Sequence, residues 1–186
     1  MSPMGTFPFQ SSSCILVMAI FASACSTGGT SKGPSSGAID VQASAPGDAW
    51  CVPTTSAHQT AGVKATNAIR SRSGLPAVTA NSLLAQAAAL HACDMAERGR
   101  MTHGGSRTSG PSQRLKALGY TSTVTAENIA AGPFGLERVL AEWSASPGHI
   151  ANIMIPRISE FGIGEAVGSD NRTRYWAAVY SAPRGR

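Results

Sequence analysis

The sequence has few charges, few aromatic residues and no apolar run long enough to cross a bilayer. Only 13% of its 186 residues are charged and 6% are aromatic, and the basic side chains are scattered, so the net charge of +5 does not indicate a nucleic-acid-binding surface. The apolar run CILVMAIFASA at 14–24 has eleven residues, whereas a transmembrane helix needs about 20. Residues 51–186 lack an HExxH helix and a Gly-x-Ser-x-Gly elbow, so two common hydrolase signatures are absent.

The run at 14–24 instead has the length of the hydrophobic region of a secretory signal. It ends in ASAC, and small residues running into Cys25 resemble the lipobox of bacterial lipoproteins, in which the cysteine is diacylated. We therefore expect a signal peptide over 1–24, lipidation at Cys25, and a flexible Ser/Gly-rich linker completing 25–50. The chain would then be exported and anchored on the outer face of the cell membrane. The segment before the run has no Lys or Arg, so plain secretion after signal cleavage is the alternative.

Cys51 and Cys93 remain in the expected domain, residues 51–186. Two exported cysteines in an oxidising compartment are expected to form a disulfide. No CxxC spacing accompanies them, so a metal role is not expected. In the chain-entropy model such a bridge contributes about 4 kcal/mol to stability.

The order of helical and strand-like patterns indicates an α+β domain, with helices packed on a small antiparallel sheet. Asn81 is expected to cap the second helix, and the first is expected to bury Ala61, Ala65, Ala68 and Ile69. Segment 100–110 is predicted to be a loop, and 121–132 to begin β-like and end in a loop. Helices are predicted over 57–73, 82–99, 111–120 and 135–146, and strands over 161–168 and 175–182.

Three residues far apart in the sequence have the chemistry of a metal site. His149 follows Ser146, a candidate cap, at a predicted helix start, where the helix dipole favours a neutral imidazole. His103 lies in a Gly-rich loop, and Glu127 stands among small and apolar residues, where an acid is rare unless paired or liganded. Spacing alone does not bring them together, and an exposed His149 on a surface turn is the alternative.

A family resemblance supports the same three positions. The motifs MTHGG, AENIAAG, SPGHIANIM and FGIGEA…YWAAVYS occur in the order seen in bacterial CAP/SCP-type domains, the superfamily of cysteine-rich secretory proteins, antigen 5 and pathogenesis-related proteins. The resemblance implies a three-layer α-β-α sandwich with a surface cleft, lined by two histidines and two acids, that binds a divalent metal in some members. His103, Glu127 and His149 match three of the cleft positions, and Zn²⁺ is the ion we expect.

The fourth cleft position departs from the family pattern. It falls near Ser146, and Glu142 could substitute for the missing acid from one helical turn away. The alternative is an exposed Glu142 paired with Arg138. Asn128 is expected to satisfy backbone groups and orient the site. His58 is expected on the surface and His91 at a helix interface, with neither in the cleft.

These observations favour a monomeric, non-enzymatic module that binds a lipid or a cell-wall component. The membrane would be a partner through the lipid anchor. A metal-dependent hydrolase acting on peptide or cell-wall material is the alternative function. A structural or adhesive domain is the third, in which the His–Glu–His trio only stabilises loops.

Overall fold

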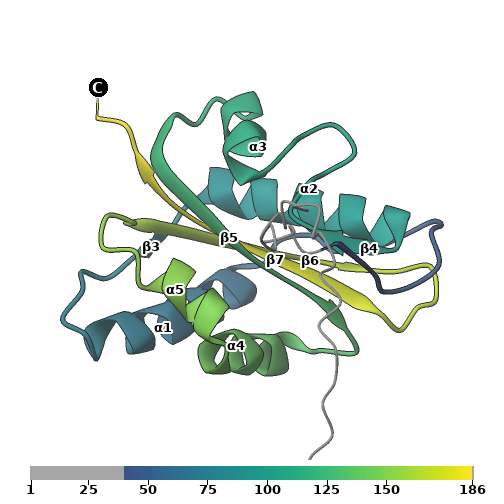
Figure 1. Cartoon of the computed structure of the whole chain (residues 1–186), viewed down its shortest axis with the longest axis horizontal. Coiled ribbons are helices and arrows are strands. Elements are labelled where there is room, and N and C mark those ends of the chain that lie inside the picture. The colour runs from purple at the N-terminus through teal and green to yellow at the C-terminus, as the bar shows by residue number, and fades with distance from the viewer. Residues whose placement is uncertain (1–39, 186) are drawn as a thin grey trace, which may run out of the picture. The chain divides into compact units, whose positions relative to one another are not determined.

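A five-stranded sheet forms the middle layer, with helices on both of its faces (Figure 1). The computed structural model describes residues 40–185. The sheet has the order β2-β6-β7-β5, and β3 pairs in parallel with β6 while the other neighbours are antiparallel. The strands are β2 (Trp50–Cys51), β3 (Thr79–Ala80), β5 (Ser122–Gly132), β6 (Glu160–Val167) and β7 (Arg174–Pro183).

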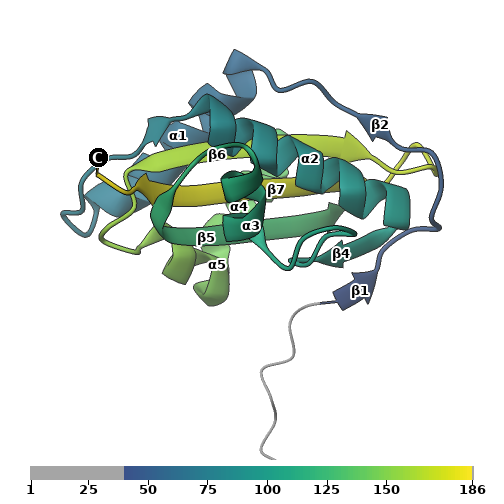
Figure 2. The ribbon, with the colours of Figure 1, turned by 90° about the horizontal axis from the view of Figure 1, so that it is seen from above.

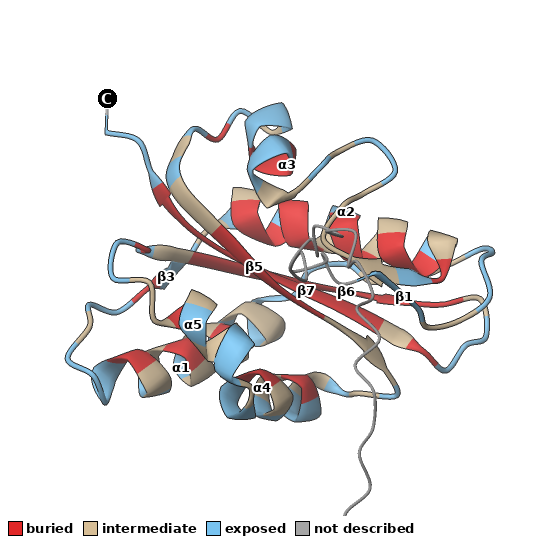
Figure 3. Cartoon of the chain, viewed as in Figure 1, coloured by how far each residue is buried: buried red, intermediate tan, exposed pale blue. Residues whose placement is uncertain are grey.

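The helices divide into two outer layers, and the buried residues face the sheet from both sides (Figure 3). Helices α2 and α3 cover one face, and α1, α4 and α5 cover the other (Figure 1). The predicted three-layer α-β-α sandwich is therefore confirmed. The helices are α1 (Ser56–Ser71), α2 (Ser82–Arg98), α3 (Pro111–Ala117), α4 (Leu136–Ala145) and α5 (Pro147–Ile153). Among the described residues, no helix is both long enough and apolar enough to span a bilayer.

Helix α2 lies unusually close to the sheet because β6 presents glycines to it. The Asn81 side chain accepts from the backbone N–H groups of Leu83 and Leu84, as predicted for a cap. A Cβ built on Gly162 would lie 2.1 Å from the backbone nitrogen of Ala85, and one on Gly164 would lie 2.2 Å from that of Ala89. The missing side chains of Gly162 and Gly164 therefore let the backbone of α2 rest directly on β6.

Helix α1 has the predicted extent but buries a different face. Gly62, Thr66 and Arg70 are its buried residues, whereas the predicted Ala68 is exposed. The Arg70 guanidinium donates to carbonyls between residues 76 and 158, including that of Ile153 at 2.7 Å. An arginine is usually exposed, and here its burial is offset by these bonds.

Two predicted loops contain strands. Residues 121–132 were expected to end in a loop, but β5 continues to Gly132 because it pairs with β7 along its length. In the segment predicted as loop 100–110, β4 (Arg100–Thr102) pairs with β1 (Asp40–Gln42) (Figure 2). The folded unit therefore begins before residue 51, within the predicted linker.

The predicted disulfide is confirmed. Cys51 on β2 and Cys93 on α2 are bonded, with their Cα atoms 5.1 Å apart and a sequence separation of 42. The bridge ties the edge strand β2 to the central helix. The predicted signal peptide and Cys25 lie outside the described residues.

The contact between α2 and β6 can be tested with one methyl group. We expect Gly164→Ala to lower the free energy of unfolding by about 3 kcal/mol or more, because the new Cβ would overlap the α2 backbone. Gly148→Ala, on exposed α5 with no atom within 4 Å of the new Cβ, is the control and should be neutral or stabilising by up to about 1 kcal/mol. Urea denaturation measures both, and equal stabilities of the two variants would contradict the packing argument.

Candidate functional site

The site residues meet at the edge strand β5, whose successive side chains point to opposite faces of the sheet. Glu127 points to the α2 and α3 face, where it contacts His91 and Arg114. Asn128 points to the other face, where its Nδ2 donates to the His149 carbonyl of α5 at 3.3 Å. The two faces meet around this edge because no further strand of the sheet covers it.

Side chains from α4 and α5 satisfy the outward carbonyls of β5. Trp143 Nε1 donates to the Ile129 carbonyl at 3.3 Å, and Asn152 Nδ2 donates to the Glu127 carbonyl at 3.0 Å. Asn152 Nδ2 also donates to Asn128 Oδ1 at 2.8 Å. These bonds hold α5 beside the strand and protect the edge from pairing with another chain.

The Glu127 carboxylate is the centre of a buried polar cluster, which we call the Glu127 cluster and which comprises Glu127, His91, His103 and Arg114. Arg114 Nη2 lies 2.5 Å from Glu127 Oε2, and His103 Nδ1 lies 2.9 Å from Oε1. His91 Nε2 lies 3.7 Å from the same Oε1. Glu127 is 4% exposed, so protein groups replace water around both carboxylate oxygens.

Arg114 positions both the acid and the loop that carries His103. Its Nη1 donates to the His103 carbonyl at 3.1 Å and to Thr108 Oγ1 at 3.2 Å. Burial by itself would raise the pKa of Glu127, but the hydrogen bond from His103 and the charge of Arg114 lower that pKa below its usual value. Glu127 is therefore an ionised carboxylate that accepts from His103 at Oε1 and from Arg114 at Oε2.

This charge state determines the proton positions on two imidazoles. Because the Glu127 carboxylate only accepts, His103 must donate from Nδ1, which leaves Nε2 as the ring nitrogen that can bind a further group. His91 Nε2 lies 2.9 Å from the Thr102 carbonyl, so it carries the proton there. Burial is the main reason that the pKa of His91 falls to about 4, and this ring stays neutral at pH 7.

His149 lies in the first turn of α5, half-buried, on the other side of the β5 edge. Its ring centroid is 6.4 Å from that of Trp143, and its Nδ1 is buried with no hydrogen-bond partner among the described residues. Burial first, and the charge of His103 second, lower the pKa of His149. The imidazole is thus in a setting that favours the neutral form, as its position at a helix start also predicts. The Ser146 side chain makes no capping bond, contrary to expectation.

The structure brings His103 and Glu127 into contact but does not make a three-ligand cluster with His149. Within residues 40–185, the one group of three candidate ligands whose donor atoms lie within 4.8 Å of one another is Cys51, Cys93 and Glu97, and two of these form the disulfide. Both carboxylate oxygens of Glu127 are engaged by protein donors. Glu127 is therefore placed to support His103 and not to be a third ligand alongside it.

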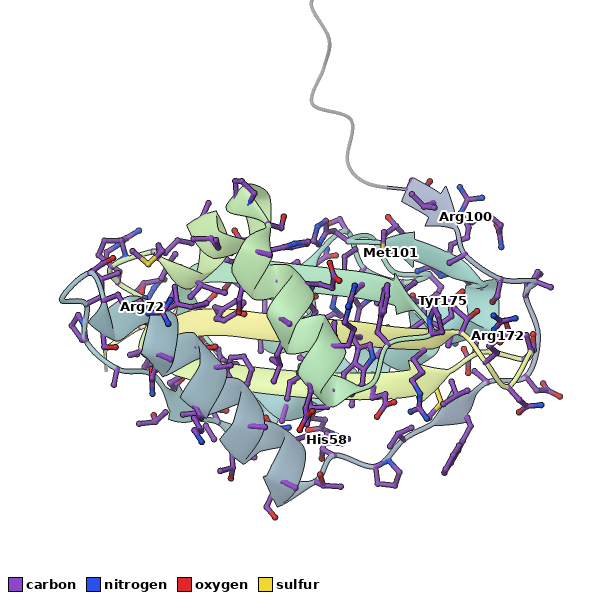
Figure 4. The ribbon with its side chains drawn as sticks, turned by 90° about the horizontal axis from the view of Figure 1, so that it is seen from below. His58, Arg72, Arg100, Met101, Arg172 and Tyr175 are labelled. Carbon is purple, nitrogen blue, oxygen red and sulfur yellow. A yellow bond between two sulfur atoms is a disulfide. The ribbon has the colours of Figure 1, made fainter. Side chains whose placement is uncertain are left out.

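The remaining predicted site residues lie as follows. Glu142 Oε1 lies 2.6 Å from Arg138 Nη2 on the outer face of α4. Glu142 therefore pairs with Arg138, which was the alternative to its replacing the missing acid of the cleft. Asn128 does satisfy a backbone group, although on a strand and not in a loop. His58, at the start of α1 (Figure 4), packs edge-on against Trp176 and lies 3.9 Å from Glu165, so it is only partly exposed.

Two members of the Glu127 cluster were missed. His91 was expected at a helix interface away from the site, yet it contacts Glu127. Arg114 was not considered, because a single arginine in a short helix carries no local signal. The signal for Arg114 is indirect: a buried carboxylate requires a positively charged partner, so an acid among apolar residues indicates a cation elsewhere in the sequence.

The fold and the Glu127 cluster together define an α-β-α sandwich domain. At the edge strand of its sheet, the imidazoles of His91 and His103 contact a buried carboxylate. Residues 63–180 match the CAP family, described as the cysteine-rich secretory protein family. The chain belongs to this family.

Individual relatives agree with this assignment. The chain is 30% identical over 111 residues to the uncharacterized protein YkwD of Bacillus subtilis, a region that covers 60% of this chain and 43% of YkwD, so the match spans less than half of that relative. An outer surface protein from Borrelia burgdorferi has a similar structure, with a TM-score of 0.62 at 20% identity, covering 71% of this chain and 97% of that one. An extracellular SCP-domain protein from Bacillus anthracis also has a similar structure, with a TM-score of 0.59 at 23% identity. The match covers 70% of this chain and 44% of that one. At these identities the two structures show a common fold.

The buried imidazole of His91 predicts how stability depends on pH. Its pKa is about 4 in the folded chain against about 6.5 when unfolded, so the unfolded state binds more protons as the pH falls below 6.5. Between pH 7 and pH 5 this group alone should reduce the free energy of unfolding by about 2 kcal/mol.

We expect His91→Gln to remove that contribution, since its amide can still donate to the Thr102 carbonyl but does not titrate. Urea denaturation at pH 7 and pH 5 measures the difference for wild type and variant. An unchanged pH dependence in the variant would show that another group is responsible.

Proposed function

We propose that this chain is an exported, membrane-anchored CAP domain that binds a ligand at a cleft able to hold a divalent metal. One observation carries the proposal: Glu127 holds His103 through Nδ1, so that the lone pair on Nε2 is the part of the ring available to a metal. A carboxylate behind a histidine is the usual arrangement for a metal-binding imidazole, because it determines the tautomer and increases the basicity of the ring.

The residues at the edge of β5 fit a divalent ion with imidazole ligands. His103 and His149 would be the protein ligands: Glu127 engages His103 through Nδ1, and burial favours at His149 the neutral ring that a metal requires. Glu127 would act from behind His103, since its two oxygens are engaged. Two imidazoles leave positions on a tetrahedral Zn²⁺ for a ligand or water, and the ion would supply a Lewis acid there.

A hollow beside the Glu127 cluster supports the ligand-binding role. It has a volume of about 480 Å³ between α2, α3 and the loop that follows β4, and both His91 and Arg114 line it. Leu90, Ala117 and Leu118 give it apolar walls. A pocket with apolar walls and a few polar groups suits a ligand with an apolar body, which favours a lipid or an amphiphilic cell-wall component over a sugar.

The hydrolase alternative receives no comparable support. Hydrolysis at a metal needs a base or a further stabilising group, and the carboxylate of the cluster has both oxygens occupied by Arg114 and His103. We therefore propose binding and not turnover.

Export and anchoring rest on the leader sequence and the disulfide. The bridge between Cys51 and Cys93 is typical of proteins in oxidising compartments outside the cytosol. The run 14–24 ending at Cys25 carries the anchoring proposal.

Metal binding is tested by zinc titration against a chromophoric chelator. Loss of a direct ligand in His149→Ala should weaken zinc binding by at least about 100-fold, whereas loss of the supporting carboxylate in Glu127→Gln should weaken it by roughly 10- to 100-fold. His58→Ala makes the same change at a histidine outside the cluster and should leave the affinity unchanged. Equal affinities of wild type and His149→Ala would refute the metal site, and this result does not depend on whether the buried Glu127 variant folds.

Anchoring is tested by radiolabelled palmitate in the producing cells. We expect label in wild type and none in Cys25→Ala, with the variant appearing in the soluble exported fraction. Cys14→Ala, within the apolar run, is the matched control and should keep the label. A labelled Cys25→Ala would exclude lipidation at this residue.

A further inference from the structure

A second hollow lies where α3 meets the start of β5 and the end of β7. It has a volume of about 290 Å³ and is lined by Ser112 and Lys116 of α3, the segment 120–122, and Arg184 directly after β7. We call it the Lys116/Arg184 hollow. It shares no lining residue with the hollow beside the Glu127 cluster, so the proposed function does not use it.

Backbone contacts keep the walls of this hollow in place. Ser112 and Lys116 are four residues apart on α3 and therefore share one face of the helix. The Tyr120 N–H donates to the Leu115 carbonyl at 3.0 Å, which ties the segment after α3 to the helix. The Arg184 N–H donates to the Thr121 carbonyl at 2.8 Å, which brings the end of the chain beside the start of β5.

The two cations of the hollow have no acidic partner among the described residues. All ten Asp and Glu side chains of the sequence lie within residues 40–185, and the ion pairs they form involve other arginines and histidines. Glu160 accepts from the hydroxyl of Tyr120, a lining residue, at 2.5 Å and does not itself line the hollow. Within residues 40–185 no carboxylate pairs with these two side chains, which give the hollow a local charge of about +2.

The polar groups around these cations are hydroxyl donors. Ser112, Thr121 and Ser122, which line the hollow, each carry a side-chain hydroxyl. An arginine presents two parallel N–H groups that match two oxygens of a phosphate, and a lysine adds a point charge. The three hydroxyls add donors for the other oxygens of a phosphate group, ester oxygens included, whereas a planar carboxylate has only two oxygens to offer.

We propose that the Lys116/Arg184 hollow binds a phosphate-bearing ligand, as a phosphate monoester or diester. The group can come from a soluble or polymer-borne glycerol phosphate or from a phospholipid headgroup, since both carry the same chemistry. The site lies beyond the ends of β5 and β7, apart from the two imidazoles of the proposed metal cleft, and it needs no metal.

The test is a titration of the full, isotope-labelled chain with glycerol 1-phosphate, followed by the amide resonances of Thr121 and Ser122 at constant ionic strength with EDTA present. We expect saturable shifts in wild type. Lys116→Gln and Arg184→Gln should each weaken the affinity at least about tenfold, because each removes a charge-assisted contact. Lys64→Gln is the control: it removes one positive charge from an exposed position on α1 and should leave the affinity unchanged.

Arg184 lies almost at the end of the chain, so its variant should fold whatever happens to the α3 variant. Binding of glycerol phosphate without cosedimentation on phosphatidylglycerol vesicles would assign the site to a soluble or polymeric phosphate. Cosedimentation that is lost in Arg184→Gln would assign it to a headgroup. The proposal is overturned if the shifts do not saturate, if acetate binds as tightly as glycerol phosphate, or if Lys64→Gln weakens binding as much as Lys116→Gln does.

Discussion

An ionised carboxylate buried at the edge of a sheet is the constraint around which the site is organised. Glu127 cannot keep its charge in this setting unless positive and hydrogen-bonding groups replace water at both oxygens. Arg114 of α3 and His103 of the loop after β4 provide them, and His91 of α2 packs beside the same carboxylate. Three segments distant in the sequence are thereby held together on one face of the sheet, and the loop that carries His103 gains a defined position.

The open edge of β5 explains how a residue from the other layer joins this arrangement. Glu127 and Asn128 are adjacent in the strand, so their side chains point to opposite faces of the sheet. Glu127 points toward the layer of α2 and α3, and Asn128 points toward α5. Asn128 and Asn152 hold α5 against the strand, and this places His149 near the face that carries His103. A central strand, covered by a neighbour on both sides, could not present side chains from both layers around one edge in this way.

Sequence reasoning succeeded where local physics decides the outcome and failed where packing does. The Asn81 cap and the two strands on either side of the turn after Val167 depend on neighbours in the chain, and both are observed. The buried face of α1 depends on which residues the sheet can accommodate. A Cβ on Gly62 would lie 2.4 Å from the Phe161 ring, so the helix buries the row of Gly62 and Arg70 rather than its alanines.

The sequence by itself determined the class of fold and the disulfide partners, because periodicity, motif order and cysteine count are readable along the chain, and it singled out His103, Glu127 and His149 as candidates. The tertiary structure decided what the acid does. Whether Glu127 faces a metal or a cation depends on which side chains surround it, and Arg114 reaches it only after α3 has packed on β5. Contacts of that kind follow from the packing of whole elements, which no short stretch of sequence encodes.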